Sequence, residues 1–379
     1  TYHLPLTTYH FPMPRKPPAA PNPTLAELRT RIDEVDRQIQ ALIAERAGYA
    51  RQVGIAKGPL KAAIDYYKPE REAQVLRAVV DRNQGPLSNE ELLRVFREIM
   101  SACLAQQNAL KIAYLGPEGT FSQSAVLKHF GHSVIAIPMV SIEEVFGEVE
   151  SGNADFGVVP VENSTEGSVH HTLDMFLTTP LKICGEIELR VHQNLLAKAG
   201  GLEQIERVYS HAQSLAQCKG WLRRNLPKAE RIAVSSNAEA ARRARNADDA
   251  AAIAGIQAAQ VYGLKVLASH IEDRPDNTTR FMVMGRELFS PSGHDKTSLL
   301  LAVKDQPGAL YQLLTPLARH GVSMTRIESR PARGEKWEYV FFIDVEGHVQ
   351  DGALAKALAD LGPVTAQLKV LGSYPAAIV

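Results

Sequence analysis

A long run of apolar residues, spaced three and four positions apart, constrains this chain more than any other feature. The spacing from Leu25 to Lys57 predicts one helix of about 33 residues, about 50 Å long. Thr24 and Glu27 form a capping-box pattern at its start, and Gly58-Pro59 follows its end. A helix of this length is stable only when its apolar side packs against other segments. The apolar positions are Leu28, Ile32, Val35, Ile39, Leu42, Ile43 and Val53.

Two shorter helices are predicted after the long one. The first runs from Glu70 to Asn83 after Pro69, and the second runs from Ser88 to about Leu110. A long helix with two shorter companions is half of a helical bundle, so we expect residues 24–110 to complete their core by dimerisation. Residues 1–23 are rich in proline and have no apolar period, which predicts a disordered leader without a function.

Three basic side chains on the long helix are candidates for binding an anion. Arg46 and Lys57 are about three turns apart, so both project from nearly one face. Arg29 is rotated by about 100° from that face, so it could reach a pocket of a partner chain but not one shared with Arg46. Basic residues on helices usually form a solvated face, and the spacing alone favours that interpretation.

Charge and composition exclude several classes of protein. Lys plus Arg and Asp plus Glu each number 42, a balance that argues against a surface for nucleic acid or acidic lipid. The sequence has no apolar run of about 18 residues and no basic segment before an apolar one, so we expect neither a membrane span nor a signal peptide. The scattered Cys103, Cys184 and Cys218 argue against disulfides and a zinc site. We therefore expect a cytoplasmic protein of about two to four domains.

From Lys111 onward the pattern changes to short apolar strands, polar loops and helices. The polar turn from Pro160 to Val169 follows a predicted strand over 154–159 and precedes a helix. Such turns lie at the carboxyl ends of parallel strands, where ligands bind and helix N-termini attract anions. The arrangement recurs in two groups before a late strand from Phe281 to Met284, which predicts two small α/β lobes around a cleft. Residues 189–197 are predicted to form a strand that crosses between the lobes.

The loops of this region do not match the common cofactor motifs. Residues 116–120 lack the Gly-Lys-Ser/Thr ending of a P-loop and do not fit the G-x-G-x-x-G fingerprint, so nucleotide binding is disfavoured. His170, His171 and His211 have no partners at metal-ligand spacing, and we expect no metal. Each polar loop, taken alone, could simply cap the helix that follows it.

The C-terminal region predicts a third unit. Residues 296–379 alternate as strand–helix–strand–strand–helix–strand, the ferredoxin-like order. Gly308 at the start of the first helix would let a ligand approach the helix N-terminus. The predicted fold is therefore multidomain, with an all-α half-bundle at 24–110, a two-lobed α/β domain at 111–287 and an α+β ferredoxin-like domain at 296–379.

Motifs of the helical region resemble the all-helical chorismate mutase family, a dimer with interlocked long helices. The resemblance implies that Arg29 of one subunit, with Arg46 and Arg71 of the other, binds the two carboxylates of chorismate. Lys57 and Gln107 would then hydrogen-bond the ether oxygen, and Glu72 would bind a hydroxyl. A unimolecular rearrangement of this kind needs only a compact conformer and charge stabilisation. The matching motifs are Leu28-Arg29, Ala44-Glu45-Arg46, Lys57 and Pro69-Glu70-Arg71-Glu72.

Two positions of the helical region depart from the family pattern, and one assignment stays open. Lys68 stands where an Asp is common, and Cys103 stands where a Ser is common. Gln106 adjoins Gln107, so either glutamine could be the one that points toward the substrate.

Residues 111–287 resemble prephenate dehydratase in their motifs and in the order of those motifs. The resemblance implies that Thr279 is the essential catalytic hydroxyl. It would help the ring hydroxyl of prephenate leave as water while the ring carboxylate leaves as carbon dioxide, giving phenylpyruvate. Aromatisation drives both losses, so no cofactor or metal is implied, and the proton donor stays open. The matching motifs are Gly116 to Ser122, Glu162 to Gly167, Tyr209 to Gln213 and Thr278 to Phe281. The implied cleft residues are Thr120, Glu162, Asn163, Ser164, Glu166, Ser210, Gln213, Arg280 and Phe281.

The third unit resembles the amino-acid-sensing ACT module. Asp305-Gln306-Pro307-Gly308-Ala309-Leu310 and Glu328-Ser329-Arg330-Pro331 carry the resemblance. It implies that phenylalanine binds between two subunits as a feedback inhibitor. The implied effector residues are Gly308, Ala309, Leu310, Glu328, Ser329, Arg330 and Pro331.

Together the resemblances imply a bifunctional enzyme that forms at least a homodimer. Its small-molecule partners would be chorismate, prephenate and L-phenylalanine, and neither nucleic acid nor membrane would be a partner. Two alternatives stay open at this stage: the two lobes could bind a small molecule without reacting with it, or the helices could serve dimerisation alone. Assays for phenylpyruvate from prephenate, and for chorismate turnover in Lys57→Ala and Arg46→Ala variants, would distinguish them.

Overall fold

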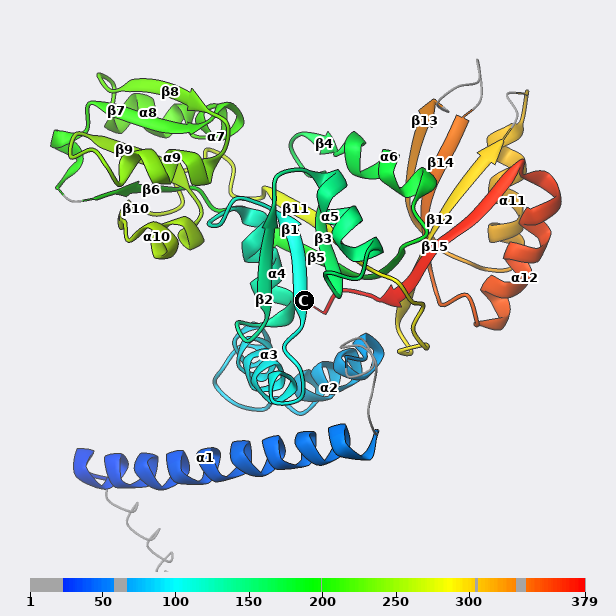
Figure 1. Cartoon of the computed structure of the whole chain (residues 1–379), viewed down its shortest axis with the longest axis horizontal. Helices are drawn as coiled ribbons and strands as arrows, with labels where there is room; N and C mark the ends of the chain where they lie inside the picture. The colour runs from blue at the N-terminus through cyan, green and yellow to red at the C-terminus, as the bar shows by residue number, and fades with distance from the viewer. Residues whose placement is uncertain (1–22, 58–66, 199, 304–305, 332–338, 379) are drawn as a thin grey trace, which may run out of the picture. The chain divides into compact units, whose positions relative to one another are not determined.

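The computed structural model describes residues 23–57, 67–198, 200–303, 306–331 and 339–378 (Figure 1). They belong to two compact units, Thr1–Gly48 and Tyr49–Val379, each of which is described by itself. The boundary falls inside helix α1 (Leu25–Ala56). The predicted leader lies outside the described residues apart from Pro23, as does the predicted helix stop at Gly58-Pro59.

Helix α1 begins where the sequence predicts it and ends one residue earlier. Thr24 N donates to Glu27 Oε2 over 2.8 Å, and Glu27 N donates to Thr24 Oγ1 over 3.3 Å, so the capping box is confirmed. The helix buries none of its residues, and its apolar positions, such as Ile32 and Ile39, are exposed.

Helices α2 (Pro69–Asp81) and α3 (Asn89–Ala105) confirm the two shorter helices. Ser88 and Glu91 form a reciprocal capping box at the start of α3. Helix α3 ends before the predicted Leu110. The reason is that Leu110 is buried in the core of the next domain, and its carbonyl accepts a hydrogen bond from Ile135 N.

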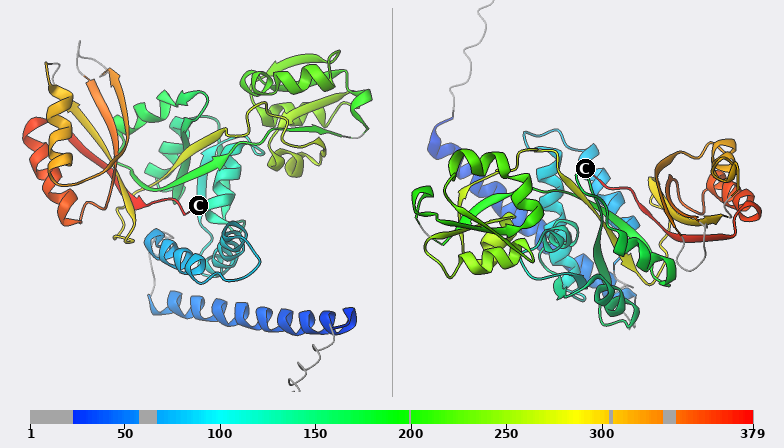
Figure 2. Two further views of the ribbon diagram at one scale, coloured as in Figure 1. Left: turned by 180° about the vertical axis from the view of Figure 1, so that it is seen from behind. Right: turned by 90° about the horizontal axis from the view of Figure 1, so that it is seen from above.

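The first lobe is a sheet with strand order β2-β1-β3-β11-β5, and the short β4 pairs with β3. The yellow strand β11 lies beside the green strand β5 (Figure 2). Strands β1, β2 and β3 are parallel, whereas β11 runs antiparallel to both β3 and β5. The strands are β1 (Lys111–Leu115), β2 (Ile135–Met139), β3 (Phe156–Asn163), β4 (Gly167–Ser168), β5 (Lys182–Arg190) and β11 (Thr278–Gly285). The helices are α4 (Phe121–Phe130), α5 (Ile142–Glu150) and α6 (His170–Thr178).

The second lobe has its own sheet, with strand order β10-β6-β9-β7-β8. Its strands are β6 (Asn194–Ala197), β7 (Arg207–His211), β8 (Glu230–Val234), β9 (Ala250–Ala254) and β10 (Lys265–Ala268). Its helices are α7 (Ala212–Gln217), α8 (Lys219–Asn225), α9 (Asn237–Ala244) and α10 (Ile256–Tyr262). The predicted strand over 189–197 is wrong as a single element. Its first residues pair with β11 in one sheet and its last residues pair with β9 in the other.

Two strands are longer than the sequence predicts, and this determines where the site residues point. Strand β3 continues through Glu162 and Asn163, which were expected in a loop. Strand β11 starts at Thr278 and so includes Thr279 and Arg280. The polar ends of the two strands pair with each other, so their backbone N–H and C=O groups have partners in the sheet. The sequence pattern does not reveal this pairing.

The C-terminal domain has the predicted ferredoxin-like order, and its antiparallel sheet runs β13-β14-β12-β15. Helices α11 (Ala309–Arg319) and α12 (Gly352–Leu361) pack on one face of this sheet. The other face packs against the first lobe, with Phe342 and Leu371 in one core with Leu173 and Phe176. The strands are β12 (Asp295–Val303), β13 (Met324–Pro331), β14 (Tyr339–Glu346) and β15 (Gln367–Pro375).

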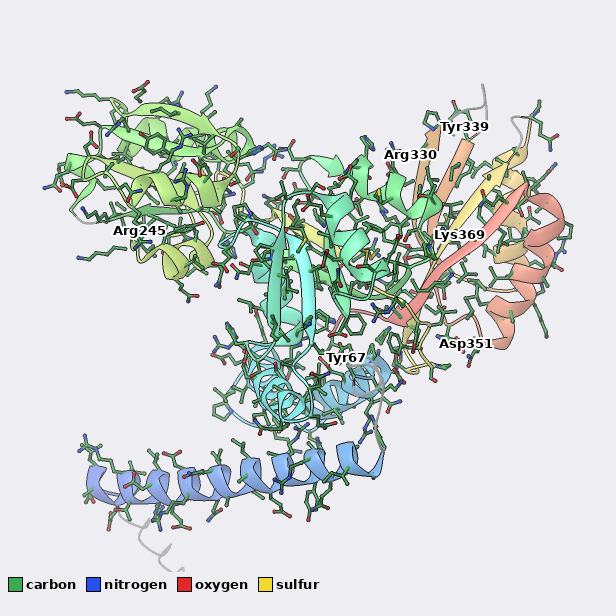
Figure 3. All side chains as sticks on the ribbon, in the orientation of Figure 1. Tyr67, Arg245, Arg330, Tyr339, Asp351 and Lys369 are labelled. Atoms are coloured by element: carbon green, nitrogen blue, oxygen red, sulfur yellow. The ribbon has the colours of Figure 1, made fainter. Side chains whose placement is uncertain are left out.

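Two cations of the C-terminal domain hold helix α6 of the first lobe at its ends (Figure 3). Arg330 donates to His170 O over 2.6 Å at the start of α6, and it pairs with Asp174 in the middle of the helix over 2.5 Å. Lys369 Nζ donates to the carbonyls of Phe176 and Thr179 at its end. A cation at a helix C-terminus satisfies carbonyls that lack intrahelical partners. In the described ranges, no helix is both long and apolar enough to cross a membrane.

Candidate active site

The candidate site of the two-lobed domain is centred on Thr279 and Asn163. The two residues are cross-strand partners on β11 and β3. Asn163 Nδ2 donates to Thr279 Oγ1 over 2.8 Å, and both side chains are half-buried. The structure therefore brings together the two residues that the sequence placed at one cleft.

The loop after β3 fixes the orientation of the Asn163 amide. Asn163 Oδ1 accepts hydrogen bonds from Thr165 N over 3.0 Å, Thr165 Oγ1 over 2.7 Å and Glu166 N over 3.2 Å. The opposite end of the amide must then be the donor toward Thr279. Because Thr279 Oγ1 accepts this bond, its own proton is directed elsewhere. Among the described residues, the structure gives that proton no acceptor.

Asn277 is a central member of the site that the sequence analysis missed. It is buried, and its Oδ1 accepts from Asn163 Nδ2 over 2.9 Å and from Thr165 Oγ1 over 3.0 Å. Its Nδ2 donates to Gln217 Oε1 over 3.3 Å, which links the first lobe to α7 of the second. Its position two residues before Thr279, in the same polar segment of the sequence, is a signal that could have found it.

In the second lobe the structure gives the predicted residues a different arrangement. Ser210 is fully buried and donates to Ile253 O over 2.8 Å and Asn237 Oδ1 over 2.9 Å, so it supports the lobe rather than facing the cleft. Gln213 is exposed on α7. Gln217, four residues later, is the glutamine that takes part in the network.

Gln193 is a second missed residue, on the segment that joins the two lobes. It is buried, and its Nε2 donates to Ser214 Oγ over 3.1 Å and to Gln217 Oε1 over 3.3 Å. Its Oε1 is buried and has no hydrogen-bond partner within the described part of the chain. An unsatisfied buried acceptor costs free energy, so this atom is suited to a donor group of a ligand.

Of the remaining predicted loop residues, Ser164 and Glu166 adjoin the network, whereas Thr120 bonds within its own loop and helix. Thr120 caps α4, and its hydroxyl donates to Pro117 O over 3.0 Å. Ser164 accepts from Thr278 N over 3.0 Å and is exposed. Glu166 is exposed, and only its backbone N contacts Asn163.

Three of the predicted cleft residues do not face Thr279, and this corrects the expectation. Arg280 and Glu162 are next to Thr279 and Asn163 on their strands, so their side chains project from the opposite face of the sheet. Arg280 binds Glu186 and Asp344, and Glu162 binds Arg326 of the C-terminal domain. Phe281 is buried in the core of the first lobe. These residues connect and fill the fold instead of lining the cleft.

The residues predicted to bind chorismate are divided between the two units. Arg29 and Arg46 belong to the first unit, and the structure does not place them relative to the others. In the second unit Lys57 and Arg71 are exposed. Glu72 is half-buried beside Tyr67 and Arg97. Burial raises the pKa of Glu72 to about 7, although the charge of Arg97 and a hydrogen bond from Tyr67 favour its ionised form.

The structure favours one of the two adjacent glutamines. Gln106 is exposed, whereas Gln107 is half-buried and its Nε2 donates to Ala50 O over 2.7 Å. Gln107 Oε1 is buried without a hydrogen-bond partner in the described residues. Gly54 leaves room for it, because a Cβ there would lie 3.1 Å from that oxygen. Gln107 therefore has an acceptor atom close to Gly54, in the part of α1 that belongs to the same unit.

The predicted effector residues are only partly available. Gly308 has φ +82° at the N-cap of α11, a conformation that favours glycine, and Leu310 is exposed. On β13 Glu328 lies 3.7 Å from Arg326, and Arg330 binds Asp174 and His170 O of the two-lobed domain. The expected direct role of the Arg330 side chain in effector binding is therefore corrected. Ala309, Ser329 and Pro331 complete the predicted set.

Three family models match consecutive parts of the chain. Residues 28–108 match chorismate mutase type II, residues 112–288 match prephenate dehydratase, and residues 297–363 match the ACT domain. With the fold described above, they define a multidomain enzyme that joins a helical mutase region, a two-lobed dehydratase domain and an ACT domain.

Whole-chain relatives carry the same three parts. The bifunctional chorismate mutase/prephenate dehydratase of Stutzerimonas stutzeri is 54% identical over 359 residues, covering 94% of this chain and 98% of the relative. The protein of the same name from Pseudomonas aeruginosa is 52% identical over 360 residues, with the same coverage. The chain belongs to the bifunctional chorismate mutase/prephenate dehydratase family.

A solved structure supports the assignment of the last two domains. The prephenate dehydratase of Arthrobacter aurescens, solved in complex with L-Phe, is 37% identical with a TM-score of 0.65. The match covers 70% of this chain and 90% of that one.

Proposed function

We propose that the chain converts chorismate to prephenate in its helical domain and prephenate to phenylpyruvate in its two-lobed domain, under feedback by L-phenylalanine. The observation that carries the dehydratase assignment is the Asn163–Thr279 hydrogen bond at the ends of β3 and β11. It supports a hydroxyl whose oxygen is engaged and whose proton is available to a ligand.

In the proposed dehydration, Thr279 donates a hydrogen bond to the departing ring hydroxyl of prephenate. The bond from the ring to the carboxylate breaks and releases carbon dioxide, and its electron pair completes the aromatic ring. The carbon–oxygen bond breaks at the same time, and the hydroxyl takes up a proton and leaves as water. Donation from Asn163 to Thr279 Oγ1 makes the threonine a stronger donor, because hydrogen bonds in a chain polarise one another.

Substitution of Thr279 tests the dehydratase proposal. We expect Thr279→Ala to lower the kcat for phenylpyruvate formation by about 10²-fold or more, the usual contribution of a positioned acid–base group. Thr279→Ser, which keeps the hydroxyl, should retain much more activity. Chorismate mutase activity of the same samples is the internal control for folding. Equal dehydration by wild type and Thr279→Ala would contradict the proposal, and a failure of the wild-type chain to consume prephenate would favour a binding protein.

For the mutase we propose the clamp of Arg29 from one subunit with Arg46 and Arg71 from the other. Lys57 and Gln107 would contact the ether oxygen, and Glu72 a hydroxyl. The unpartnered Oε1 of Gln107 and the exposed apolar side of α1 support a site completed by a second copy of the helix.

Chorismate turnover tests this proposal. We expect Arg46→Ala and Lys57→Ala to lower turnover by about 10²-fold, since each removes a charge from the transition state. Arg37→Ala is the matched control, because Arg37 is an exposed cation of the same helix that binds Glu34 and the carbonyl of Asp33, neither of which is a predicted site residue. Wild-type rates in both test variants would leave the helices with a role in dimerisation alone.

We propose that L-phenylalanine binds the ACT domain at the N-terminus of α11, between two subunits. Gly308 allows a close approach to the helix start, and nothing lies within 4 Å of its missing Cβ. We expect Gly308→Ala to weaken inhibition of dehydration by L-phenylalanine by about 10-fold. Gly321→Ala is the control, because Gly321 also has a positive φ and open surroundings in the same domain. Equal inhibition of the two variants would contradict this site.

A further inference from the structure

The residues behind the catalytic pair form a cross-strand pair of their own. Thr279 lies opposite Asn163 in the pairing of β11 with β3, and Arg280 lies opposite Glu162. Successive side chains on a strand point to opposite faces, so Arg280 and Glu162 project from the back of the dehydratase sheet. The ACT domain packs on that side.

The ACT sheet presents a pair of opposite sign at the same place. Arg326 on β13 and Asp344 on β14 are cross-strand partners. Arg280 Nη1 lies 2.7 Å from Asp344 Oδ2, and Arg326 Nε lies 2.9 Å from Glu162 Oε2. We call Glu162, Arg280, Asp344 and Arg326 the charge quartet.

The central ion pair of the quartet is buried and held on both sides. Only 13% of the Arg280 side chain and 7% of the Asp344 side chain are exposed. Arg280 Nη2 also lies 2.8 Å from Glu186 on β5, and Ser298 Oγ donates to Asp344 Oδ1 over 2.5 Å. Buried ion pairs are stable only with close geometry and further hydrogen bonds, so this contact restricts how the two sheets can shift.

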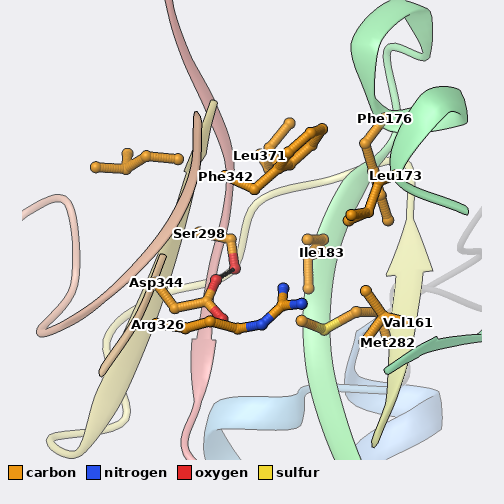
Figure 4. Close-up of a pocket in the computed structure, with 11 residues that line it drawn as sticks. Val161, Leu173, Phe176, Ile183, Met282, Ser298, Arg326, Phe342, Asp344 and Leu371 are labelled. Atoms are coloured by element: carbon orange, nitrogen blue, oxygen red, sulfur yellow. Dashed lines mark hydrogen bonds between the residues drawn. The ribbon is translucent and has the colours of Figure 1, made fainter. Parts of the chain in front are cut away.

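The space beside Asp344 and Arg326 of the quartet is small and mostly apolar (Figure 4). A pocket there has room for about one water molecule. Val161, Ile183 and Met282 line it from the dehydratase side, and Phe342 and Leu371 from the ACT side. Asp344 and Arg326 of the quartet therefore face mainly apolar side chains on this side.

Strand β3 is irregular beside the quartet, because it carries one extra residue, Val161, between the residues that pair with Arg280 and Phe281. The register of β11 against β3 therefore shifts at this point. Such a bulge interrupts the ladder of backbone hydrogen bonds and redirects nearby side chains. The pairs Arg280–Glu162 and Thr279–Asn163 directly follow this bulge, so the geometry of the second pair depends on what anchors the first.

We propose that Arg280 and Asp344 are positioning residues for dehydration. Through the charge quartet, the ACT domain holds Thr279 and Asn163 in their reactive geometry, and it thereby forms part of the dehydratase scaffold. The proposal rests on the proposed role of Thr279. It goes beyond effector binding, because the contact between the two domains would support dehydration in the absence of phenylalanine.

The test is Asp344→Asn in the full chain, assayed without phenylalanine. The variant keeps the shape of the side chain and removes the charge that holds Arg280. We expect the dehydratase kcat to fall about 10- to 100-fold, because small misplacements of a reacting group have costs of this size. The KM for prephenate should change less than about twofold, since the quartet does not line the cleft. Mutase activity should stay at the wild-type value.

Two further variants keep the test interpretable. Asp360→Asn is the matched control, because Asp360 pairs with Arg319 and His320 within the ACT domain and contacts no quartet residue. We expect it to leave the dehydratase kcat unchanged. Ser298→Ala keeps the charge of Asp344 but removes one bond that holds it, and we expect a kcat between those of wild type and Asp344→Asn.

The outcomes separate this proposal from the proposed function. A wild-type kcat in Asp344→Asn overturns the positioning role and leaves the role of Thr279 intact. If Asp344→Asn does not fold, as judged by loss of its mutase activity and of cooperative unfolding, a wild-type kcat in Ser298→Ala overturns the proposal in the same way. Full dehydration by Thr279→Ala would instead contradict the proposed function itself.

Discussion

At the scale of single residues, the dehydratase site depends on the orientation of one amide. Asn163 can donate to Thr279 only because Thr165 and Glu166 donate to its other end. The same amide donates to Asn277, which thereby shares the task of orienting it. Thr279 is thus one member of a chain of hydrogen bonds, and residues that never touch substrate should affect the reaction.

Asn277→Ala should reveal this dependence. The substitution removes the acceptor of Asn163 and the link to Gln217. We expect the dehydratase kcat to fall by about 10-fold, the equivalent of one or two net hydrogen bonds. Steady-state kinetics with prephenate measures the effect. Asn246→Ala, which removes an exposed asparagine of the second lobe, should have no effect, and equal rates in the two variants would contradict the orienting role.

Glu186 should make the stability of the chain depend on pH. Burial raises the pKa of this carboxyl, but the charges of Arg280 and Lys296 lower it more, so the net pKa is below 4.5. A lowered carboxyl pKa stabilises the fold above the unfolded-state value, and this contribution is lost as the pH falls through the folded-state pKa.

We therefore expect Glu186→Gln to destabilise the chain by about 3 kcal/mol at pH 7, the cost of breaking a buried ion pair. The difference from wild type should shrink as the pH falls below 4.5. Urea unfolding at several pH values measures it. Glu239→Gln is the control and should cost less than about 1 kcal/mol, because its partners Arg242 and Arg243 are exposed. A difference for Glu186→Gln that does not change with pH would contradict this account.

At the scale of elements, the residue pattern predicted the helices and most strands but not where β3 and β11 begin and end. Pro160, Glu162 and Asn163 have the composition of a loop, and Thr279 and Arg280 precede an apolar run. Each segment becomes a strand because it pairs with the other, more than a hundred positions away along the chain. A local sequence pattern does not predict pairing between such distant segments.

This error at the element level produced the error at the site. A loop could have turned Thr279 and Arg280 toward the same ligand, whereas a strand directs them to opposite faces. The proposed catalytic pair was predictable because the motifs of the resemblance name Asn163 and Thr279. The role of Arg280 was not predictable, because its partners Glu186 and Asp344 lie on other strands, one of them in another domain.

Strand β15 approaches β5 so closely that only glycine fits at one position. A Cβ at Gly372 would lie 2.0 Å from Ile183 O and 2.7 Å from Ile183 N. We expect Gly372→Ala to destabilise the chain by about 1–3 kcal/mol, the usual cost of overpacking, because the backbones must separate. Thermal unfolding measures it. Gly362→Ala, at an open position in the same domain, is the control, and equal melting temperatures of the two variants would contradict the close contact.

At the scale of the whole molecule, α1 stands out because none of its residues is buried in the described part of the chain, although one of its sides is apolar. Ile32, Val35 and Ile39 are about half exposed. Helices of this length bury such a side only by association, which agrees with the proposed dimer. The domain order was predictable from sequence motifs. The oligomeric state depends instead on apolar surface that is exposed in a single chain.

Ile39→Arg should weaken the proposed dimer. A charge on the apolar side of α1 would be buried without a partner, so we expect a smaller assembly in light scattering and a loss of mutase activity of about 10-fold or more. Gln38→Arg, on the polar side of the same helix, should leave both unchanged. An unchanged mass for Ile39→Arg would show that α1 is not the contact.

The contacts of the C-terminal domain with α6 have a consequence for recombination between related genes. Arg330 and Lys369 bind the two ends of a helix that the sequence encodes well over a hundred positions earlier. A recombination event in the connecting residues 286–294 would separate these cations from the helix that they hold. A hybrid of two distant relatives joined there should fold only when its C-terminal domain already carries cations that match the helix. The boundary between the two domains is therefore an unfavourable site for recombination.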